Sequence, residues 1–244
     1  MRRADGGEII IAQFNEKNRR VTNEHLEEIF KEVGQRYGYD TVKAEFVALD
    51  DFKIRWQRSY KWIDLRISDY LDRAPDEVLY DLADSIFRRV LGKGDGLGEV
   101  FVKYITDPDF SQSTRPQYLN RKHGLTQSTV GEFHDLNDSV YRLRSMGLIP
   151  AGTDCYLTWD KFPRSRQCAN TSPLMRTVQI SSNLDIKGVP ESVLDYCVYY
   201  GISTLATFAY PNRDNEQFQK MLARYPMKEE AEQWLHKNYY FAGS

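Results

Sequence analysis

The stretch that decides the fold is VLDYCVYYGISTL, residues 193–205. It follows Pro190, and proline suits the first turn of a helix because its missing N–H has no helical partner there. We therefore predict a long helix from Pro190 to about Phe208. Two further helices are predicted after it, near Asn215–Arg224 and Lys228–Asn238.

The residues before this helix predict a helix and two strands. Leu136, Val140 and Leu143 recur at helical spacing, so a helix is expected over Asp135–Gly147. Tyr156–Trp159 and Arg176–Ser181 have the composition of strands. We expect a polar loop, Asp160–Pro173, to join these two strands.

The first half of the chain predicts a similar series. Thr22 is a good N-cap for a helix that Gly38 closes, and Pro75 opens a second helix that runs to about Leu91. The glycine-rich residues 92–98 lack the order of a phosphate loop and are interpreted as a turn. The other predicted elements are a strand or helix entry at 8–14, strands at 43–49, 52–57 and 62–68, and short helices at 99–106 and 115–122.

The two halves resemble each other, with a helix, strands and a helix opened by proline. Arg66-Ile67-Ser68 corresponds to Gln179-Ile180-Ser181, Pro75 to Pro190, and Ile54-Arg55-Trp56 to Leu157-Thr158-Trp159. We interpret this as an old duplication that made two related helix-strand-strand-helix modules, residues 1–124 and 125–244. The expected fold class is α+β, either as two domains or as one compact domain in which the modules pack together.

Composition narrows the functional classes. The net charge of −2 gives no general attraction to nucleic acid, so a nucleic-acid partner is not expected. No apolar run is long enough to span a membrane, and residues 1–7 do not resemble a secretory signal. Cys155, Cys168 and Cys197 are too far apart for a zinc knuckle and are expected to be reduced thiols. A cytoplasmic protein without a membrane partner is therefore expected.

The second half resembles the SprT-like zinc metallopeptidases, which belong to the zincins. The family carries HExxH in a phrase such as VLDYVVxHELxHL, and a later phrase such as PNHSKEFWxLxxRYP supplies a third histidine. This chain has VLDYCVYYGISTL at 193–205 and YPNRDNEQFQKMLARYP at 210–226. The resemblance covers about 100 residues and implies a zincin-like fold.

The residues that carry zinc chemistry in the family are replaced here. By position, the two HExxH histidines fall on Tyr200 and Thr204, and the glutamate falls on Gly201. The third ligand falls on Arg213 or on Asp214, depending on which residues anchor the alignment. Two histidines at i and i+4 hold the zinc, and the glutamate activates its water. We therefore expect no zinc, no cofactor and no catalytic residue, and hence no peptidase activity.

The resemblance implies a pseudoenzyme that keeps a groove for a peptide or protein. Tyr200, Thr204, Tyr210 and Arg213 would line the former zinc pocket, unless these side chains fill it by packing. In zincins an edge strand beside the active helix pairs with extended peptide, and 176–181 is the candidate here. The alternatives are a structural protein with a dimer or scaffold surface and a nucleic-acid-associated relative that uses Arg115, Arg121, Lys122, Arg164 and Arg166. The sequence leaves the oligomeric state open.

Overall fold

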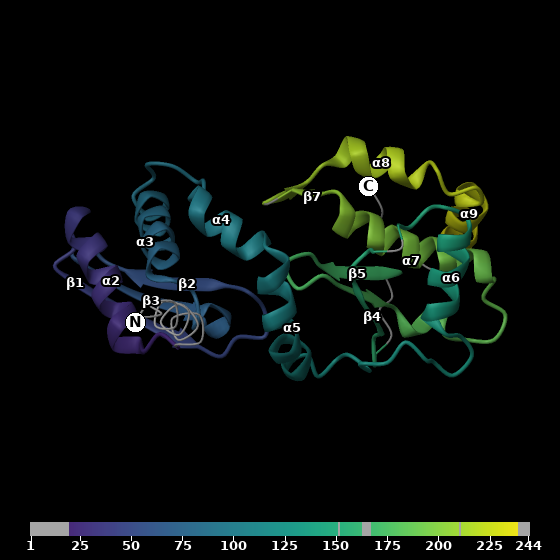
Figure 1. Cartoon of the computed structure of the whole chain (residues 1–244), viewed down its shortest axis with the longest axis horizontal. Coiled ribbons are helices and arrows are strands. Elements are labelled where there is room, and N and C mark those ends of the chain that lie inside the picture. The colour runs from purple at the N-terminus through teal and green to yellow at the C-terminus, as the bar shows by residue number, and fades with distance from the viewer. Residues whose placement is uncertain (1–19, 151, 163–166, 210, 239–244) are drawn as a thin grey trace, which may run out of the picture. The chain divides into compact units, whose positions relative to one another are not determined.

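The computed structural model describes residues 20–150, 152–162, 167–209 and 211–238, and it confirms the α+β class (Figure 1). The chain divides into two compact units, residues 1–110 and 111–244. The sequence analysis divides it after residue 124, beyond helix α5 (Pro108–Arg121). The element predicted at 8–14 lies outside the described residues.

The amino-terminal unit places two helices on one face of a three-stranded sheet. Helix α2 (Asn23–Arg36) begins after Thr22, whose side chain accepts a hydrogen bond from the N–H of His25. The chain leaves the helix through Gly38, whose φ of +86° suits glycine. The strands are β1 (Thr41–Val47), β2 (Ile54–Arg58) and β3 (Trp62–Ser68). They lie in the order β1-β3-β2, with β1 parallel and β2 antiparallel to β3.

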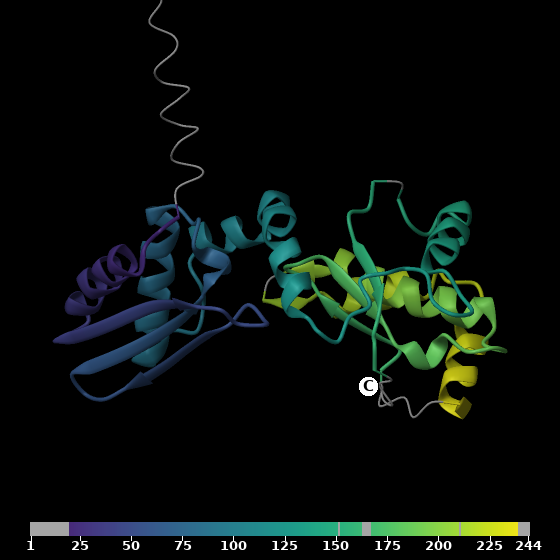
Figure 2. The same ribbon diagram turned by 90° about the horizontal axis from the view of Figure 1, so that it is seen from below.

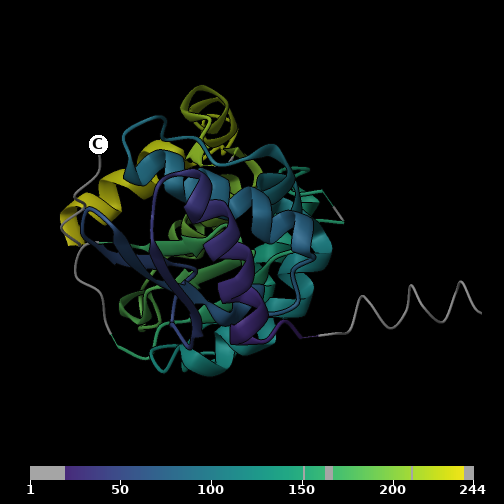
Figure 3. The same ribbon diagram turned by 90° about the vertical axis from the view of Figure 1, so that its left-hand side faces the viewer.

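Within residues 20–110, helices cover only one face of this sheet. The inward side chains Val42, Ala44, Ile63 and Leu65 are buried beneath α2 and α3 (Asp76–Val90). Figure 2 shows both helices on the same side of the strands, and Figure 3 shows α2 in purple beside them. The opposite face carries the alternating exposed residues of β1 and β3, and in the edge strand β2 residues 55–58 are all exposed.

The glycine-rich turn is closed by a carboxylate of this same chain. It leads into helix α4 (Glu99–Thr106), and Asp81 of α3 accepts a hydrogen bond of 2.8 Å from the N–H of Phe101. The N–H of Gly98 donates to Ser85 Oγ at 2.8 Å. A Cβ on Gly98 would lie 1.8 Å from the Asp81 carboxylate, so a larger residue there would displace Asp81 from this position. Asp81 therefore occupies the helix N-terminus at which a phosphate loop would hold phosphate.

The carboxy-terminal unit also has a three-stranded sheet. After α5 come α6 (Leu136–Ser145), the strands β4 (Tyr156–Trp159), β5 (Ala169–Ser172) and β6 (Thr177–Ile180), and α7 (Glu191–Ala206). The short strands β7 (Phe208–Ala209) and β8 (Asn212–Arg213) lead to α8 (Asn215–Leu222) and α9 (Lys228–Asn238). The prediction of a loop over 160–173 was wrong in its last part, because residues 169–172 form the whole of β5. The residues of β5, ANTS, are polar or small and show no alternation of apolar and polar side chains that would predict a strand.

The two sheets have the same topology. The order β4-β6-β5 has β4 parallel and β5 antiparallel to β6, as β1 and β2 are to β3. Each central strand leads to a single 3-10 turn, Asp69–Leu71 or Ser182–Leu184, and then to a proline that precedes a helix.

Two sequence predictions are corrected by this topology. Ile54-Arg55-Trp56 lies in β2, whose counterpart is β5, so its pairing with residues 157–159 of β4 was wrong. The segment predicted as an edge strand, 176–181, contains the central strand β6. The two edge strands of this sheet are β4 and β5, and β5 is the one that pairs antiparallel with β6.

No helix within the described residues is long and apolar enough to cross a membrane.

Candidate functional site

Helix α7 carries Tyr200, Gly201 and Thr204, the positions predicted from the sequence to correspond to HExxH, and Gly201 lies where the helix approaches the sheet most closely. A Cβ built on Gly201 would lie 2.3 Å from Cγ1 of Val178 in β6. Carbon atoms pack at about 3.5–4.0 Å, so the helix lies closer to the sheet than any other residue would permit. Residue 201, the position predicted to correspond to the glutamate of HExxH, therefore faces the sheet, and a carboxylate side chain has no room there.

The side chain of Tyr200 packs against Phe218. Its ring meets the ring of Phe218 edge to face, with 5.2 Å between the centroids. Thr204, one turn later, donates its hydroxyl to the backbone carbonyl of Tyr200 at 2.9 Å. The two positions that would hold zinc are thus a half-buried phenol ring and a hydroxyl bonded to its own helix.

The candidates for the third ligand are also engaged. Asp214 caps α8, accepting a hydrogen bond of 3.0 Å from the N–H of Gln217. Arg213 places its guanidinium 3.7 Å from the centroid of Phe218 and donates Nε to Asn215 at 3.1 Å. The predicted residues Tyr200 and Arg213 are therefore brought together on either side of Phe218, which the sequence analysis did not name. Tyr210 lies outside the described residues.

The described part of the chain contains no group of three or more His, Cys, Asp or Glu residues that could hold a metal ion.

A buried ion pair holds α7 against α6. Arg142 donates Nε and Nη2 to the two carboxylate oxygens of Asp195, at 2.8 and 2.7 Å. Asp195 is only 2% exposed, and its hydrogen bonds raise the pKa of Arg142. Sequence reasoning missed this pair, although the two residues lie in DLNDSVYRLR and VLDY, the phrases that carry the family resemblance.

The other face of α7 is tied to the helices that follow it. Tyr225 donates its hydroxyl to the carbonyl of Ser192 at 2.7 Å, and Tyr196 donates to Glu232 of α9. Burial raises the pKa of both phenols. Cys197 is fully buried between these contacts, and burial, followed by a hydrogen bond with Cys168, raises the pKa of its thiol. All three cysteines are free thiols.

The edge of the sheet beside α7 is β5. The N–H of Ser181 donates to the carbonyl of Cys168 at 2.9 Å, so these two residues form a hydrogen-bonded pair of the antiparallel ladder. Hydrogen-bonded and non-bonded pairs alternate along such a ladder. Ala169 and Thr171 therefore direct their backbone N–H and C=O groups away from β6, toward the outer edge.

The opposite edge of the sheet is covered by the chain itself. The N–H of Thr126 donates to the carbonyl of Trp159 at 2.9 Å, and the N–H of Trp159 donates to Ser128 at 3.2 Å. Segment 124–128 therefore runs along β4 and blocks that edge. The other edge strand, β5, has no such segment bonded to its outer side among the described residues.

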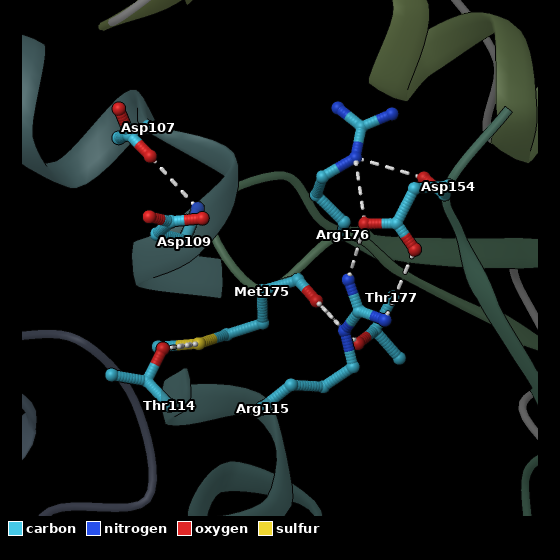
Figure 4. A network of polar contacts seen from close by, with 8 residues as sticks. All are labelled: Asp107, Asp109, Thr114, Arg115, Asp154, Met175, Arg176 and Thr177. Carbon is cyan, nitrogen blue, oxygen red and sulfur yellow. Dashed lines mark hydrogen bonds and ion pairs between the residues drawn. The ribbon is translucent and has the colours of Figure 1, made fainter. Parts of the chain in front are cut away.

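Arg115 cannot serve as a basic group for nucleic acid. It donates Nη1 and Nη2 to Asp154 at 3.2 and 2.8 Å, and Nε to the carbonyl of Met175 at 2.9 Å (Figure 4). Arg176 donates Nε to the backbone carbonyl of Asp154 at 2.8 Å. The hydrogen bond from Arg115 lowers the pKa of Asp154. This cluster anchors α5 to the turn before β6, and Arg164 and Arg166 of the predicted basic group lie outside the described residues.

No family model matches the chain, and the comparisons with curated proteins and with solved structures give no match either.

Proposed function

We propose that this chain is a non-catalytic relative of the SprT-like zinc metallopeptidases that binds extended peptide along β5. The proposal includes a zincin-like fold in the carboxy-terminal unit, its duplication in the amino-terminal unit, and a cytoplasmic location. The observation that carries it is the juxtaposition of α7, which holds the HExxH positions, with an antiparallel edge strand whose Ala169 and Thr171 direct backbone groups outward.

The absence of hydrolysis follows from the packing of α7. Gly201 lies against Val178, and Tyr200 packs on Phe218, so neither a general base nor two imidazoles are available. Water activation by zinc needs both. The same packing leaves the backbone of β5 unaffected, because strand addition uses main-chain groups rather than catalytic side chains.

Metal content and cleavage test the first half of the proposal. The chain is purified without chelator, dialysed against zinc sulfate and then against buffer, and its zinc is measured by mass spectrometry. It is then incubated with casein, an unfolded protein. We expect far less than one zinc per chain and intact casein. Stoichiometric zinc together with casein fragments contradicts the proposal.

Binding of labelled casein tests the second half. Fluorescence anisotropy with fluorescein-casein should show binding that Thr171→Pro weakens about fivefold or more, because proline removes the outward N–H and edge strands tolerate proline. Thr171→Val is the matched control, since it keeps the N–H and the shape of the side chain. Absence of binding, or equal affinity for Thr171→Pro and Thr171→Val, refutes strand addition at β5.

A further inference from the structure

The outer face of the amino-terminal sheet is open where the matching face of the other sheet is covered. In the carboxy-terminal unit, Gln179 of β6 is buried, and its Nε2 donates a hydrogen bond of 3.2 Å to the hydroxyl of Tyr118 in α5. Gln127 donates its N–H to the buried Thr158 on the same sheet. The residue that corresponds to Gln179 in the other unit is Arg66, and its side chain is 62% exposed. This open face is therefore built with polar and aromatic side chains instead of a covering helix.

Three aromatic rings are exposed around the β2–β3 hairpin. Tyr60 in the turn is 87% exposed, Trp62 is 44% exposed, and Trp56 on the edge strand is 40% exposed. Trp62 is on the outer face, because Ile63 beside it is buried inward and side chains alternate along a strand. Trp56 pairs with the buried Leu65 and therefore lies on the other face of the sheet. Trp62 on the outer face and Tyr60 in the adjoining turn are the two exposed rings that indicate an interaction surface.

The first part of the same hairpin is basic, although Lys53 pairs with Asp51 and Lys61 pairs with Asp40. Asp64 of β3 lies on the outer face between Trp62 and Arg66. Residues 53–62, KIRWQRSYKW, contain two lysines and two arginines and no acidic residue. Arg55 lies directly opposite Arg66 in the register of β2 and β3, an arrangement of like charges that costs stability. Arg66 pairs with Glu45 at 3.4 Å, but neither Arg55 nor Arg58 forms an ion pair with a residue that the structure describes. These two cations are therefore available to an anionic ligand.

We propose that the β2–β3 hairpin and the outer face beside it form a binding site for single-stranded nucleic acid. Arg55 on the outer face contacts one phosphate, and Trp62 and Tyr60 stack with bases. Arg58, which pairs with the inward-facing Ile63 at the turn end of β2, contacts a second phosphate at the edge of the hairpin. A single strand fits because its bases are free to stack on aromatic side chains, whereas duplex bases are already stacked. An acidic peptide would use the cations but not the rings. The overall charge of −2 is compatible with this site, because the surplus of positive charge is local to the hairpin.

Fluorescein-labelled dT20 and rU20 test the proposal by anisotropy on the full chain. We expect Tyr60→Ala and Trp62→Ala each to weaken binding about fivefold or more, as for loss of a base-stacking ring. Trp62→Phe should keep most of the affinity because it keeps a ring. Tyr141→Ala is the matched control, since Tyr141 is a 73% exposed ring in α6 of the other unit.

Salt dependence tests the role of the arginines. Two phosphate contacts to a single strand give a slope of about −1.4 in log affinity against log salt, or about a sevenfold loss between about 50 and 200 mM salt. Arg55→Ala should reduce the magnitude of this slope by about 0.7.

Three results would overturn the proposal. They are no binding of either oligonucleotide at about 50 mM salt, equal binding of poly-glutamate, and unchanged affinity for both Tyr60→Ala and Trp62→Ala. Circular dichroism of each variant separates loss of binding from loss of folding. This site is independent of peptide binding at β5, so Thr171→Pro should leave oligonucleotide affinity unchanged.

Discussion

Replacement of Gly201 by alanine tests the packing that excludes a catalytic glutamate. The new Cβ would lie 2.3 Å from Val178 Cγ1, more than 1 Å inside the usual contact distance of about 3.5–4.0 Å. Val178 is fully buried in the central strand, and its branched side chain is stiff, so it cannot easily move away. Overpacking of this kind costs about 1–3 kcal/mol. Alanine recovers up to about 1 kcal/mol through its higher helix propensity.

The net effect of Gly201→Ala should therefore be a destabilisation of about 1 kcal/mol, which combines these two opposing contributions. In a chain of this size, that change lowers Tm by about 2–4 °C. The measurement is urea unfolding followed by circular dichroism, with thermal unfolding as a check.

A double-mutant cycle with Val178→Ala isolates the contact. Removal of the Val178 methyl groups makes room for the new Cβ, so Gly201→Ala should become neutral or stabilising in that background. The expected coupling energy is about 1–3 kcal/mol. A coupling energy below about 0.5 kcal/mol would show that the helix does not approach the sheet as described and would refute the reasoning.

Three further outcomes are expected. Arg142→Met leaves the Asp195 carboxylate buried without its partner and should cost about 3 kcal/mol in urea unfolding; an effect below about 1 kcal/mol would mean that solvent reaches Asp195. Asp154→Asn should lower the free energy of unfolding by less than about 1 kcal/mol, because Asp154 is partly exposed. The pKa of Asp154 is lowered in the folded chain, so its contribution is present at neutral pH and is lost as pH falls through that lowered pKa. The difference between Asp154→Asn and the parent should therefore shrink in acid, and a difference that grows below about pH 4 would contradict this sign.

Local signals explain why most of the elements were predictable. Thr22 accepts the cap hydrogen bond expected of it, and Pro75 and Pro190 each precede a helix, because these effects depend on neighbouring residues only. The strand at 62–68 was also predicted with its observed bounds, since its apolar residues alternate. The reading of Gly92–Gly98 as a turn depended on missing motif residues, and Asp81 now supplies its physical basis.

Strand order was not predictable in the same way. β5 has four polar or small residues, ANTS. It forms a strand because its backbone pairs with β6 by hydrogen bonds. For the same reason, the prediction of an edge strand at 176–181 was wrong, since β6 is central. Which residues line an edge depends on pairing between segments distant in sequence, and no local pattern reports that pairing.

The sequence by itself determined the helices, the fold class and the absence of imidazole and carboxylate at positions 200, 201 and 204, because each follows from residue type and short-range spacing. Only the tertiary structure decided how those positions are used. Gly201 is the point of closest approach to Val178, Tyr200 packs on Phe218, and Thr171 faces an outer edge. These outcomes depend on atoms that come together from separate elements, and the distances between such atoms exist only once the chain has folded.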